Sequence, residues 1–258
     1  IIRAVKAIRC EMLERQRLEA WAGAYPPVRT PKRVLVVMAG NIPLVGFFDL
    51  LCVLASGHAC RVKPSSKDTV LIGYVVDLLR TIDPAIPLRM AEQGERPDAV
   101  IATGSDNANR YFRMLFGGIP SLLRGSRQSV AILSGRETAA ELSGLEEDIF
   151  AYSGLGCRNV SLLFLPRGYL PELRCTALNE KYRRNYLRER ALLRMRRMPF
   201  VDLDGAVLCE DRSFPTALSR IHYTFYDSLA DVEAWLAAHD DRLQCVVSQC
   251  VRHSRRVA

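Results

Sequence analysis

Long apolar runs are missing from this sequence, which argues against a membrane-spanning helix. The most apolar region, residues 42–60, is interrupted by Pro43, Asp49 and His58. A membrane span needs roughly 18 or more uninterrupted apolar residues. We therefore interpret this region as buried helix and expect no membrane span.

Paired cysteine motifs are also missing, although the sequence has eight cysteines. They are scattered without a Cys-x-x-Cys pair, and several lie inside apolar runs. This spacing favours neither a secreted disulfide framework nor a zinc site. The first residues also lack the successive basic, apolar and cleavage regions of a signal peptide. We expect no metal and a reducing, cytoplasmic setting.

The main basic cluster lacks the aromatic ladder that single-strand nucleic-acid binders use for stacking. The formal net charge is +8, and the densest run of Lys and Arg, residues 181–197, is strongly helical with Leu187, Leu192 and Met195 interleaved. This pattern argues against nucleic acid as a partner. We interpret the run as a solvated basic helix face, with a polyanionic ligand such as coenzyme A, or an acidic carrier protein, as the alternative.

The sequence does contain an alternation of β-branched apolar runs and amphipathic helical stretches. Residues 33–39 predict a buried strand, 42–56 a helix and 59–63 the next strand. The same alternation predicts helices at 69–82, 137–148 and 229–238, and a helix that follows the turn at 104–106 and ends at Phe116. It predicts strands at 98–103, 129–133, 160–165, 202–208, 220–226 and 244–248. Alternation at this spacing is typical of parallel sheets with crossover helices.

Three segments follow from this α/β pattern. We predict an N-terminal helical segment at residues 1–30, a Rossmann-type dinucleotide-binding domain at 31–133 and a second α/β domain at 134–258. The turn after the first strand, AGNIPLVG at residues 39–46, has no G-x-G-x-x-G fingerprint. A dinucleotide must therefore bind through a different set of contacts.

Cys157 stands out among the cysteines because of its neighbours. Gly154 and Gly156 precede it, and Arg158 and Asn159 follow it, between a predicted helix and a strand. Glycines permit a tight turn and the close approach of a ligand, and a neighbouring cation lowers a thiol pKa. From the local sequence alone, Cys157 is either a reactive nucleophile or a small buried apolar residue.

Four blocks of sequence lie in a fixed order at residues 40–51 (GNIPLVGFFDLL), 63–68 (KPSSKD), 102–112 (ATGSDNANRYF) and 148–166 (DIFAYSGLGCRNVSLLFLP). Together they resemble the acyl-CoA reductase (LuxC-like) family, a branch of the aldehyde dehydrogenase superfamily. The resemblance implies an aldehyde dehydrogenase-like fold, with a Rossmann-type cofactor domain and an α/β catalytic domain. It also implies that Cys157 is the catalytic nucleophile.

The resemblance assigns a second catalytic role to Asn41. Its side-chain amide, with the backbone N–H of Cys157, would hold the oxyanion of a tetrahedral intermediate. Taken from the residues alone, Asn41 could instead be the N-cap of a helix that begins at Ile42.

Further matches imply cofactor-binding residues. Lys63 matches the lysine that bonds the adenosine ribose of the dinucleotide, and Gly104 and Ser105 match the turn at a helix start near the pyrophosphate. Ser66 occupies the position where NAD-preferring relatives have a glutamate. A hydroxyl can donate to a 2′-phosphate that a carboxylate would repel, so this departure implies NADPH.

The water-activating glutamate of hydrolytic aldehyde dehydrogenases has no counterpart here. The corresponding stretch is LLRGS at residues 122–126. An enzyme that exchanges its acyl group with coenzyme A needs no activated water. We interpret Arg124 and Arg127 as surface arginines, with contacts to coenzyme A phosphates as the alternative.

The implied activity is NADPH-dependent reduction of a long-chain fatty acyl-CoA to the aldehyde through a cysteinyl thioester. The alternatives are a short-chain acylating aldehyde dehydrogenase and a truncated, inactive module that binds acyl-CoA or nucleotide. Relatives continue past the equivalent of Ser248, so we expect a chain truncated at both ends, with an incomplete catalytic domain. The substrate class is an acyl-CoA or other acyl thioester. The resemblance leaves room for an acyl-transfer partner protein, and for a homo-oligomer where the C-terminal segment is present.

Overall fold

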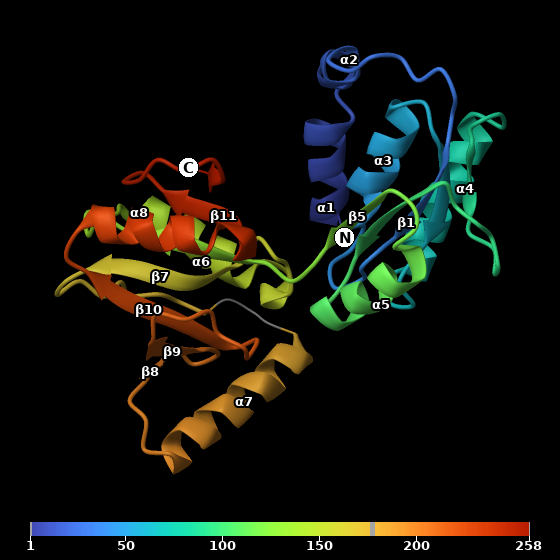
Figure 1. Ribbon diagram of the computed structural model, residues 1–258. Coiled ribbons are helices and arrows are strands. Elements are labelled where there is room, and N and C mark those ends of the chain that lie inside the picture. The colour runs from blue at the N-terminus through green and yellow to red at the C-terminus, as the bar shows by residue number, and fades with distance from the viewer. Residues whose placement is uncertain (1, 176–178, 258) are drawn as a thin grey trace. The chain divides into compact units, whose positions relative to one another are not determined.

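The computed structural model divides the chain into two compact units, Ile1–Ser126 and Arg127–Ala258, each built around a mainly parallel sheet (Figure 1). It describes residues 2–175 and 179–257. No helix in these ranges is both long and apolar enough to cross a membrane.

The first unit contains a five-stranded parallel sheet in the order β3-β2-β1-β4-β5. The strands are β1 (Arg33–Val37), β2 (Ala59–Lys63), β3 (Leu88–Met90), β4 (Ala99–Thr103) and β5 (Ser121–Arg124). The helices are α1 (Ile2–Ala7), η1 (Ile8–Met12), α2 (Arg15–Gly23), α3 (Phe47–Ala55), α4 (Thr69–Ile82) and α5 (Asp106–Phe116). This strand order is that of a Rossmann-type sheet: β2 and β3 are added on one side of β1, and β4 and β5 on the other.

Apolar faces of the helices hold this sheet in place. Every second residue of β1 and β2 is buried, and these side chains pack against Leu50 of α3 and Ile72 of α4. The predicted bounds of β2 and α4 are confirmed. The short strands β3 and β5 were not predicted, because three or four residues carry too little periodicity to distinguish them from a loop.

The second unit contains a seven-stranded sheet in the order β12-β11-β6-β7-β10-β9-β8. Its strands are β6 (Gln128–Ile132), β7 (Val160–Pro166), β8 (Val201–Asp202), β9 (Val207–Glu210), β10 (Arg220–Tyr226), β11 (Leu243–Ser248) and β12 (Arg256–Val257). Its helices are α6 (Ala139–Phe150), η2 (Ala151–Gly154), α7 (Glu180–Met195), α8 (Leu229–Ala238) and η3 (Asp240–Arg242). All described pairs are parallel except β8 with β9.

Alternate residues of the central strands face two different cores. Leu163 and Leu165 of β7 pack with Leu145 of α6, whereas Leu162 and Phe164 pack with apolar residues of α8. Because side chains alternate across a strand, α6 and α8 cover opposite faces of the sheet. Burial on both faces explains the continuous apolar sequence of β7.

Two predicted boundaries differ from the structure. A single strand was predicted at 202–208, but the chain turns at Asp204, which has a φ of 53°, and β8 and β9 pair there as antiparallel strands. The predicted domain boundary after residue 133 would assign β6 to the first unit. In the structure β6 hydrogen-bonds to β7 and β11, and the units divide between Ser126 and Arg127.

Candidate functional site

The predicted cofactor residues lie together at the carboxyl edge of the first sheet. Lys63 is the last residue of β2, and Ser66 lies in the turn that follows it. Gly104 and Ser105 directly follow β4. Since β1 pairs with both β2 and β4 in parallel register, the connections after all three strands emerge at the same edge. This edge, at the point where the strand order reverses, is where open α/β sheets bind ligands.

A buried carboxylate fixes the loop that carries Asn41. The backbone N–H of Leu44 donates to Asp68 Oδ2 at 2.9 Å, and Asp68 is only 6% exposed. Leu44 has a left-handed φ of 57°, and its carbonyl accepts from Phe47 N–H at 3.0 Å. Helix α3 therefore begins at Phe47 with Gly46 as its N-cap. The interpretation of Asn41 as an N-cap is wrong, and its side chain is exposed in the turn before the helix.

The turns after β1 and β2 are in close contact. A Cβ placed on Gly40 would lie 2.6 Å from the side chain of Ser65, closer than real Cβ contacts allow. Glycine is thus required for the backbone of the first turn to approach the second. The two turns therefore pack directly against each other at this edge, although the common glycine fingerprint is missing.

Helix α5 presents its N-terminus at the same edge. Ser105 is its N-cap, and the Ser105 hydroxyl oxygen accepts from Ala108 N–H at 3.3 Å. The remaining free N–H groups and the helix dipole favour an anion there. The exposed Lys63 side chain adds a cation to the same edge. These residues fit a dinucleotide with its pyrophosphate at the start of α5.

Arg124 is engaged within the first unit. Its Nη1 lies 2.5 Å from Oδ1 of the largely buried Asp49 of α3, so this ion pair links β5 to α3. Arg124 is partly exposed, as expected of a surface arginine, but its charge is paired with Asp49. The pair was not predicted, because 75 residues separate its members and no local pattern connects them.

Cys157 lies in a tight turn immediately before β7 in the second unit. Asn159 closes this turn: its Oδ1 accepts from Gly156 N–H at 2.8 Å, and its Nδ2 donates to the carbonyls of Asp148 and Ala151. These bonds tie the turn to the end of α6. The Cys157 side chain is exposed.

Strained backbone leads into this turn. Tyr152 and Ser153 have φ values of 51° and 56°, and Gly154 follows at 62°. Non-glycine residues rarely adopt the left-handed region, at a cost of order 1–3 kcal/mol each, and such strain often accompanies function. Two such residues in succession show that the surrounding structure holds this backbone segment in a strained conformation. Apart from its glycines, this segment has no local sequence pattern that predicts the strain.

Ser129 anchors the Cys157 turn to the sheet. Its hydroxyl donates to the Cys157 carbonyl at 2.9 Å and accepts from the backbone N–H of Cys245 at 3.1 Å. Ser129 is fully buried on β6, so both bonds are shielded from water. Sequence analysis missed this residue, because a serine within an apolar strand has no local signature of such a role.

The surroundings of the Cys157 thiol shift its pKa in opposing directions. The packing of protein around the thiol and the nearby Cys245 raise its pKa, whereas its own backbone N–H and the cations of Arg158 and Arg127 lower it. The net shift is upward. The neighbouring cation of Arg158 lowers the pKa as expected, but desolvation is the largest effect and sets the direction of the shift.

A small polar cavity of about 170 Å³ adjoins the same turn. Gly154, Gly156 and Asn159 line one side. Gln128 also lines it; this side chain accepts from the Ser161 hydroxyl at 2.7 Å and donates to the Pro215 carbonyl. This cavity offers hydrogen-bonding groups beside Cys157.

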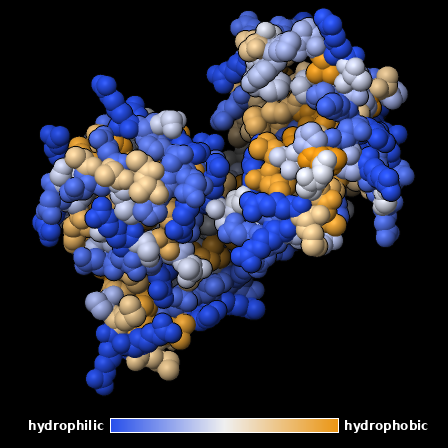
Figure 2. Space-filling model, in the orientation of Figure 1, coloured by the Kyte–Doolittle hydropathy of each residue, from blue (hydrophilic) through white to orange (hydrophobic). Residues whose placement is uncertain are grey.

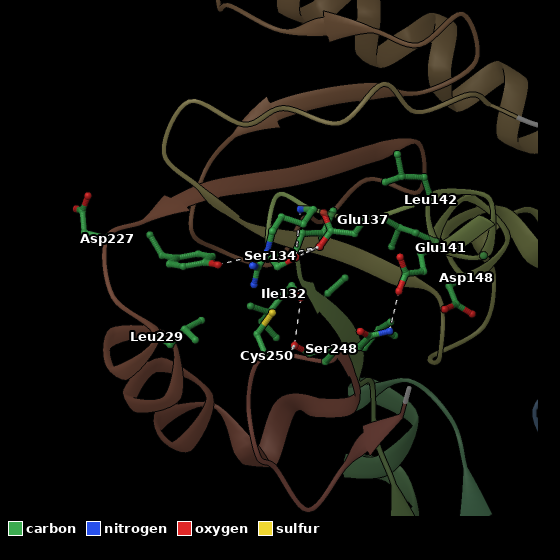
Figure 3. Close-up of a pocket in the computed structure, with 18 residues that line it drawn as sticks. Ile132, Ser134, Glu137, Glu141, Leu142, Asp148, Asp227, Leu229, Ser248 and Cys250 are labelled. Carbon is green, nitrogen blue, oxygen red and sulfur yellow. Dashed lines mark hydrogen bonds between the residues drawn. The ribbon is translucent and has the colours of Figure 1, made fainter. Parts of the chain in front are cut away.

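A larger hollow in the second unit lies elsewhere. It has a volume of about 840 Å³ and is lined by α6 and by residues that follow the carboxyl ends of β6, β10 and β11 (Figure 3). Gln249 donates to Glu141 at its rim, and Ser248 donates to the Ile132 carbonyl within it. Cys157 precedes the amino end of β7 and does not line this hollow. No group of three or more His, Cys, Asp or Glu in the described ranges is arranged to hold a metal ion.

Comparison with solved structures shows an aldehyde dehydrogenase-like fold. A putative aldehyde dehydrogenase from Burkholderia cenocepacia matches 88% of this chain with a TM-score of 0.66 and 18% identity. The Mycobacterium tuberculosis aldehyde dehydrogenase complexed with NAD+ matches 78% with a TM-score of 0.62 and 17% identity. An acetylating aldehyde dehydrogenase from Geobacillus thermoglucosidasius matches 84% with a TM-score of 0.56 and 10% identity.

The likeness covers only part of these proteins. The chain spans 60%, 53% and 60% of their respective lengths. No family model matches the sequence, and no curated protein matches it either. The predicted fold class, an aldehyde dehydrogenase-like α/β fold with a Rossmann-type unit, is confirmed.

Removal of the Asp68 carboxylate should loosen the loop of Asn41. We expect Asp68→Ala to lower the free energy of unfolding by about 1–3 kcal/mol, because the buried Leu44 N–H loses its acceptor. Asp68→Asn keeps one oxygen acceptor and should lose less. Chemical denaturation of the three proteins measures the difference. Equal losses in both variants would show that the charge of Asp68, rather than its bond to Leu44, stabilises the loop.

The raised pKa of Cys157 predicts the pH dependence of its alkylation. The rate of carbamidomethylation at Cys157 should keep rising beyond pH ~8.5, the ordinary thiol pKa, because only the thiolate reacts. Arg158→Ala removes a cation that lowers this pKa and should slow the reaction at pH 8. Peptide mass spectrometry with timed quenching resolves Cys157 from the other cysteines. A rate that is already constant above pH 7 would contradict the prediction.

Proposed function

We propose that this protein reduces a long-chain fatty acyl-CoA to the aldehyde with NADPH, through a thioester on Cys157. The observation that carries the proposal is an exposed cysteine in a turn held by Ser129 and Asn159, with Arg127 and Arg158 near the thiol. The aldehyde dehydrogenase-like fold supports an oxidoreductase that acts on an aldehyde or its acyl equivalent.

The covalent step follows from the chemistry of the thiol. The Cys157 thiolate attacks the carbonyl carbon of the acyl thioester, and the tetrahedral intermediate collapses with loss of the coenzyme A thiolate, which takes up a proton. The product is an acyl-cysteine thioester. A fixed turn keeps the sulfur in position for both formation and breakdown of this bond.

The nicotinamide cofactor, when bound, supplies a hydride. This hydride would reduce the acyl-cysteine carbonyl, and Cys157 would leave as the thiolate when the aldehyde is released. Lys63, Ser66, Gly104 and Ser105 would hold this cofactor at the carboxyl edge of the first sheet. An exposed hydroxyl at Ser66 accommodates a 2′-phosphate, which favours NADPH.

The oxyanion of the intermediate needs hydrogen-bond donors. We assign Asn41 to this role from the resemblance, with the backbone N–H of Cys157 as the second donor. The Asp68 bond that fixes the Asn41 turn supports the assignment, since a donor is effective when its position is fixed in advance.

Transfer to coenzyme A, rather than to water, is supported by the stretch at residues 122–126. It forms β5 and the following turn, and its one charged residue, Arg124, is paired with Asp49. This stretch offers no carboxylate to activate water, so the acyl-cysteine should resist hydrolysis. A short-chain acylating aldehyde dehydrogenase uses the same chemistry, and the fold of the Geobacillus enzyme favours it as the second candidate.

An acyl adduct on Cys157 is the first expected result. Incubation with palmitoyl-CoA without nucleotide should add one palmitoyl mass, because no group activates water to remove it. Cys157→Ser should give no adduct, since an unactivated hydroxyl is a much weaker nucleophile than a thiol. Intact-protein mass spectrometry measures the added mass.

The other cysteines serve as internal controls. Peptide mapping should place the acyl group on Cys157 and not on Cys175 or Cys209. Acylation of either of these instead would show that the active site is misplaced. Absence of any adduct in a folded protein that binds NADPH would favour the inactive binding module. Faster acylation by acetyl-CoA than by palmitoyl-CoA would favour the short-chain enzyme.

Cofactor preference tests Ser66. Fluorescence titration should show tighter binding of NADPH than of NADH. Ser66→Glu should weaken NADPH binding roughly tenfold or more, because a carboxylate repels the 2′-phosphate, and should change NADH binding little. Ser66→Thr keeps a hydroxyl and is the matched control. Tighter binding of NADH by the unaltered protein would refute the assignment.

A further inference from the structure

The positive charge of this protein is concentrated on one helix. Residues 179–198 contain eight Lys or Arg and two Glu, and so carry six of the eight net positive charges of the chain. The rest of the sequence is close to balanced. These residues form α7 and the turn that follows it, and much of the surface over α7 is hydrophilic (Figure 2).

Several of these cations are exposed and have no acidic partner. Arg184 pairs with Glu180, and Arg190 and Arg194 pair with Asp202. Five exposed cations form no ion pair within the described residues: Lys181, Arg183, Arg188, Arg196 and Arg197. Exposed Lys and Arg side chains without an acidic partner attract an anionic molecule from solution.

The opposite face of α7 is firmly packed. Tyr186 and Leu193 are buried against Val207 and Cys209 of β9. Glu189, also buried, pairs with Arg220 Nη2 at 2.5 Å. The apolar face of α7 is therefore buried against the sheet and is not available to insert into a lipid bilayer.

Apolar side chains are interspersed with the exposed cations. Leu187 is 50% exposed, Met195 81% and Met198 46%. Methionine side chains adapt to irregular partner surfaces. The tyrosines of α7 are buried, so the exposed face has no aromatic ring on which a nucleic-acid base could stack. Cations mixed with flexible apolar groups fit an acidic protein surface better than a nucleic acid.

The start of α7 adjoins the segment that leads to Cys157. The backbone N–H of Asn179 donates to the Ser153 hydroxyl at 3.1 Å. Tyr182 stacks edge-on with Phe150, and its ring lies 3.3 Å from the position of a Cβ on Gly154. The basic surface thus extends from the neighbourhood of the Cys157 turn along a helix roughly 24 Å long.

We propose that the exposed face of α7 docks a small acidic acyl carrier protein, which delivers its acyl thioester to Cys157. This inference rests on the proposed function for the transfer itself, although the docking can be measured separately. The carrier's acidic surface would neutralise the unpaired cations, and its thioester arm would reach the turn beside the start of the helix. The transfer is an exchange of thioesters: the Cys157 sulfur gains the acyl group, and the carrier's thiolate leaves and takes up a proton.

Charge reversal on α7 tests the docking. We expect Arg183→Glu with Arg188→Glu to weaken binding of a palmitoyl-loaded acyl carrier protein at least tenfold, by calorimetry at low salt, and to flatten its salt dependence. The matched control, Arg29→Glu with Arg80→Glu, changes the net charge equally at exposed positions of the first unit and should bind normally. Arg183→Lys with Arg188→Lys keeps the charge and should retain most of the binding.

Turnover separates the docking from the proposed reaction. The α7 charge-reversal variant should raise KM for the palmitoyl carrier protein at least tenfold and change KM for palmitoyl-CoA less than twofold. An equal loss with both substrates would show that α7 binds coenzyme A phosphates and would overturn the docking proposal. Unchanged carrier binding in the variant would also overturn it. So would a variant that binds a single-stranded oligonucleotide more weakly but binds the carrier protein normally. Absence of aldehyde from palmitoyl-CoA with the unaltered protein would refute the proposed reaction, while the binding measurement would still decide the docking.

Discussion

Parallel strand pairing is the constraint on which both parts of the candidate site depend. In the first unit it brings the connections after β1, β2 and β4 to one edge, although Lys63 and Gly104 are 41 residues apart in sequence. In the second unit it requires the chain to return to the amino edge before β7 begins, and Cys157 lies in that return. Parallel sheets need such crossovers, because each new strand must start at the same edge as the last.

The sheets position the two loops of the candidate site, and one buried side chain then fixes each loop by hydrogen bonding. Asp68 holds the turn of Asn41 through Leu44, and Ser129 holds the Cys157 turn through its carbonyl. Each of these groups is shielded from water, so its bond is costly to lose. A reactive side chain at the surface can thus have a well-defined position because buried groups hold the backbone that carries it.

Charge and burial act in opposite directions around Cys157. Desolvation raises the pKa of the thiol, and Arg158 and Arg127 lower it. A thiol with a raised pKa is protonated at neutral pH but is a strong nucleophile once ionised. Binding of an anionic thioester substrate near these arginines would bring further charge into this balance. The clustered cations of α7 lie on the same unit and favour the arrival of acidic partners.

The sequence by itself determined the alternating α/β fold and the bounds of β2, α4, β10 and α8, because these depend on local periodicity and on near neighbours in the chain. Only the tertiary structure decided where α3 begins, that β6 belongs to the second sheet, and that Arg124 pairs with Asp49. It also decided the direction of the Cys157 pKa shift. These features depend on contacts between residues far apart in sequence and on exclusion of water, and neither leaves a periodic pattern along the chain.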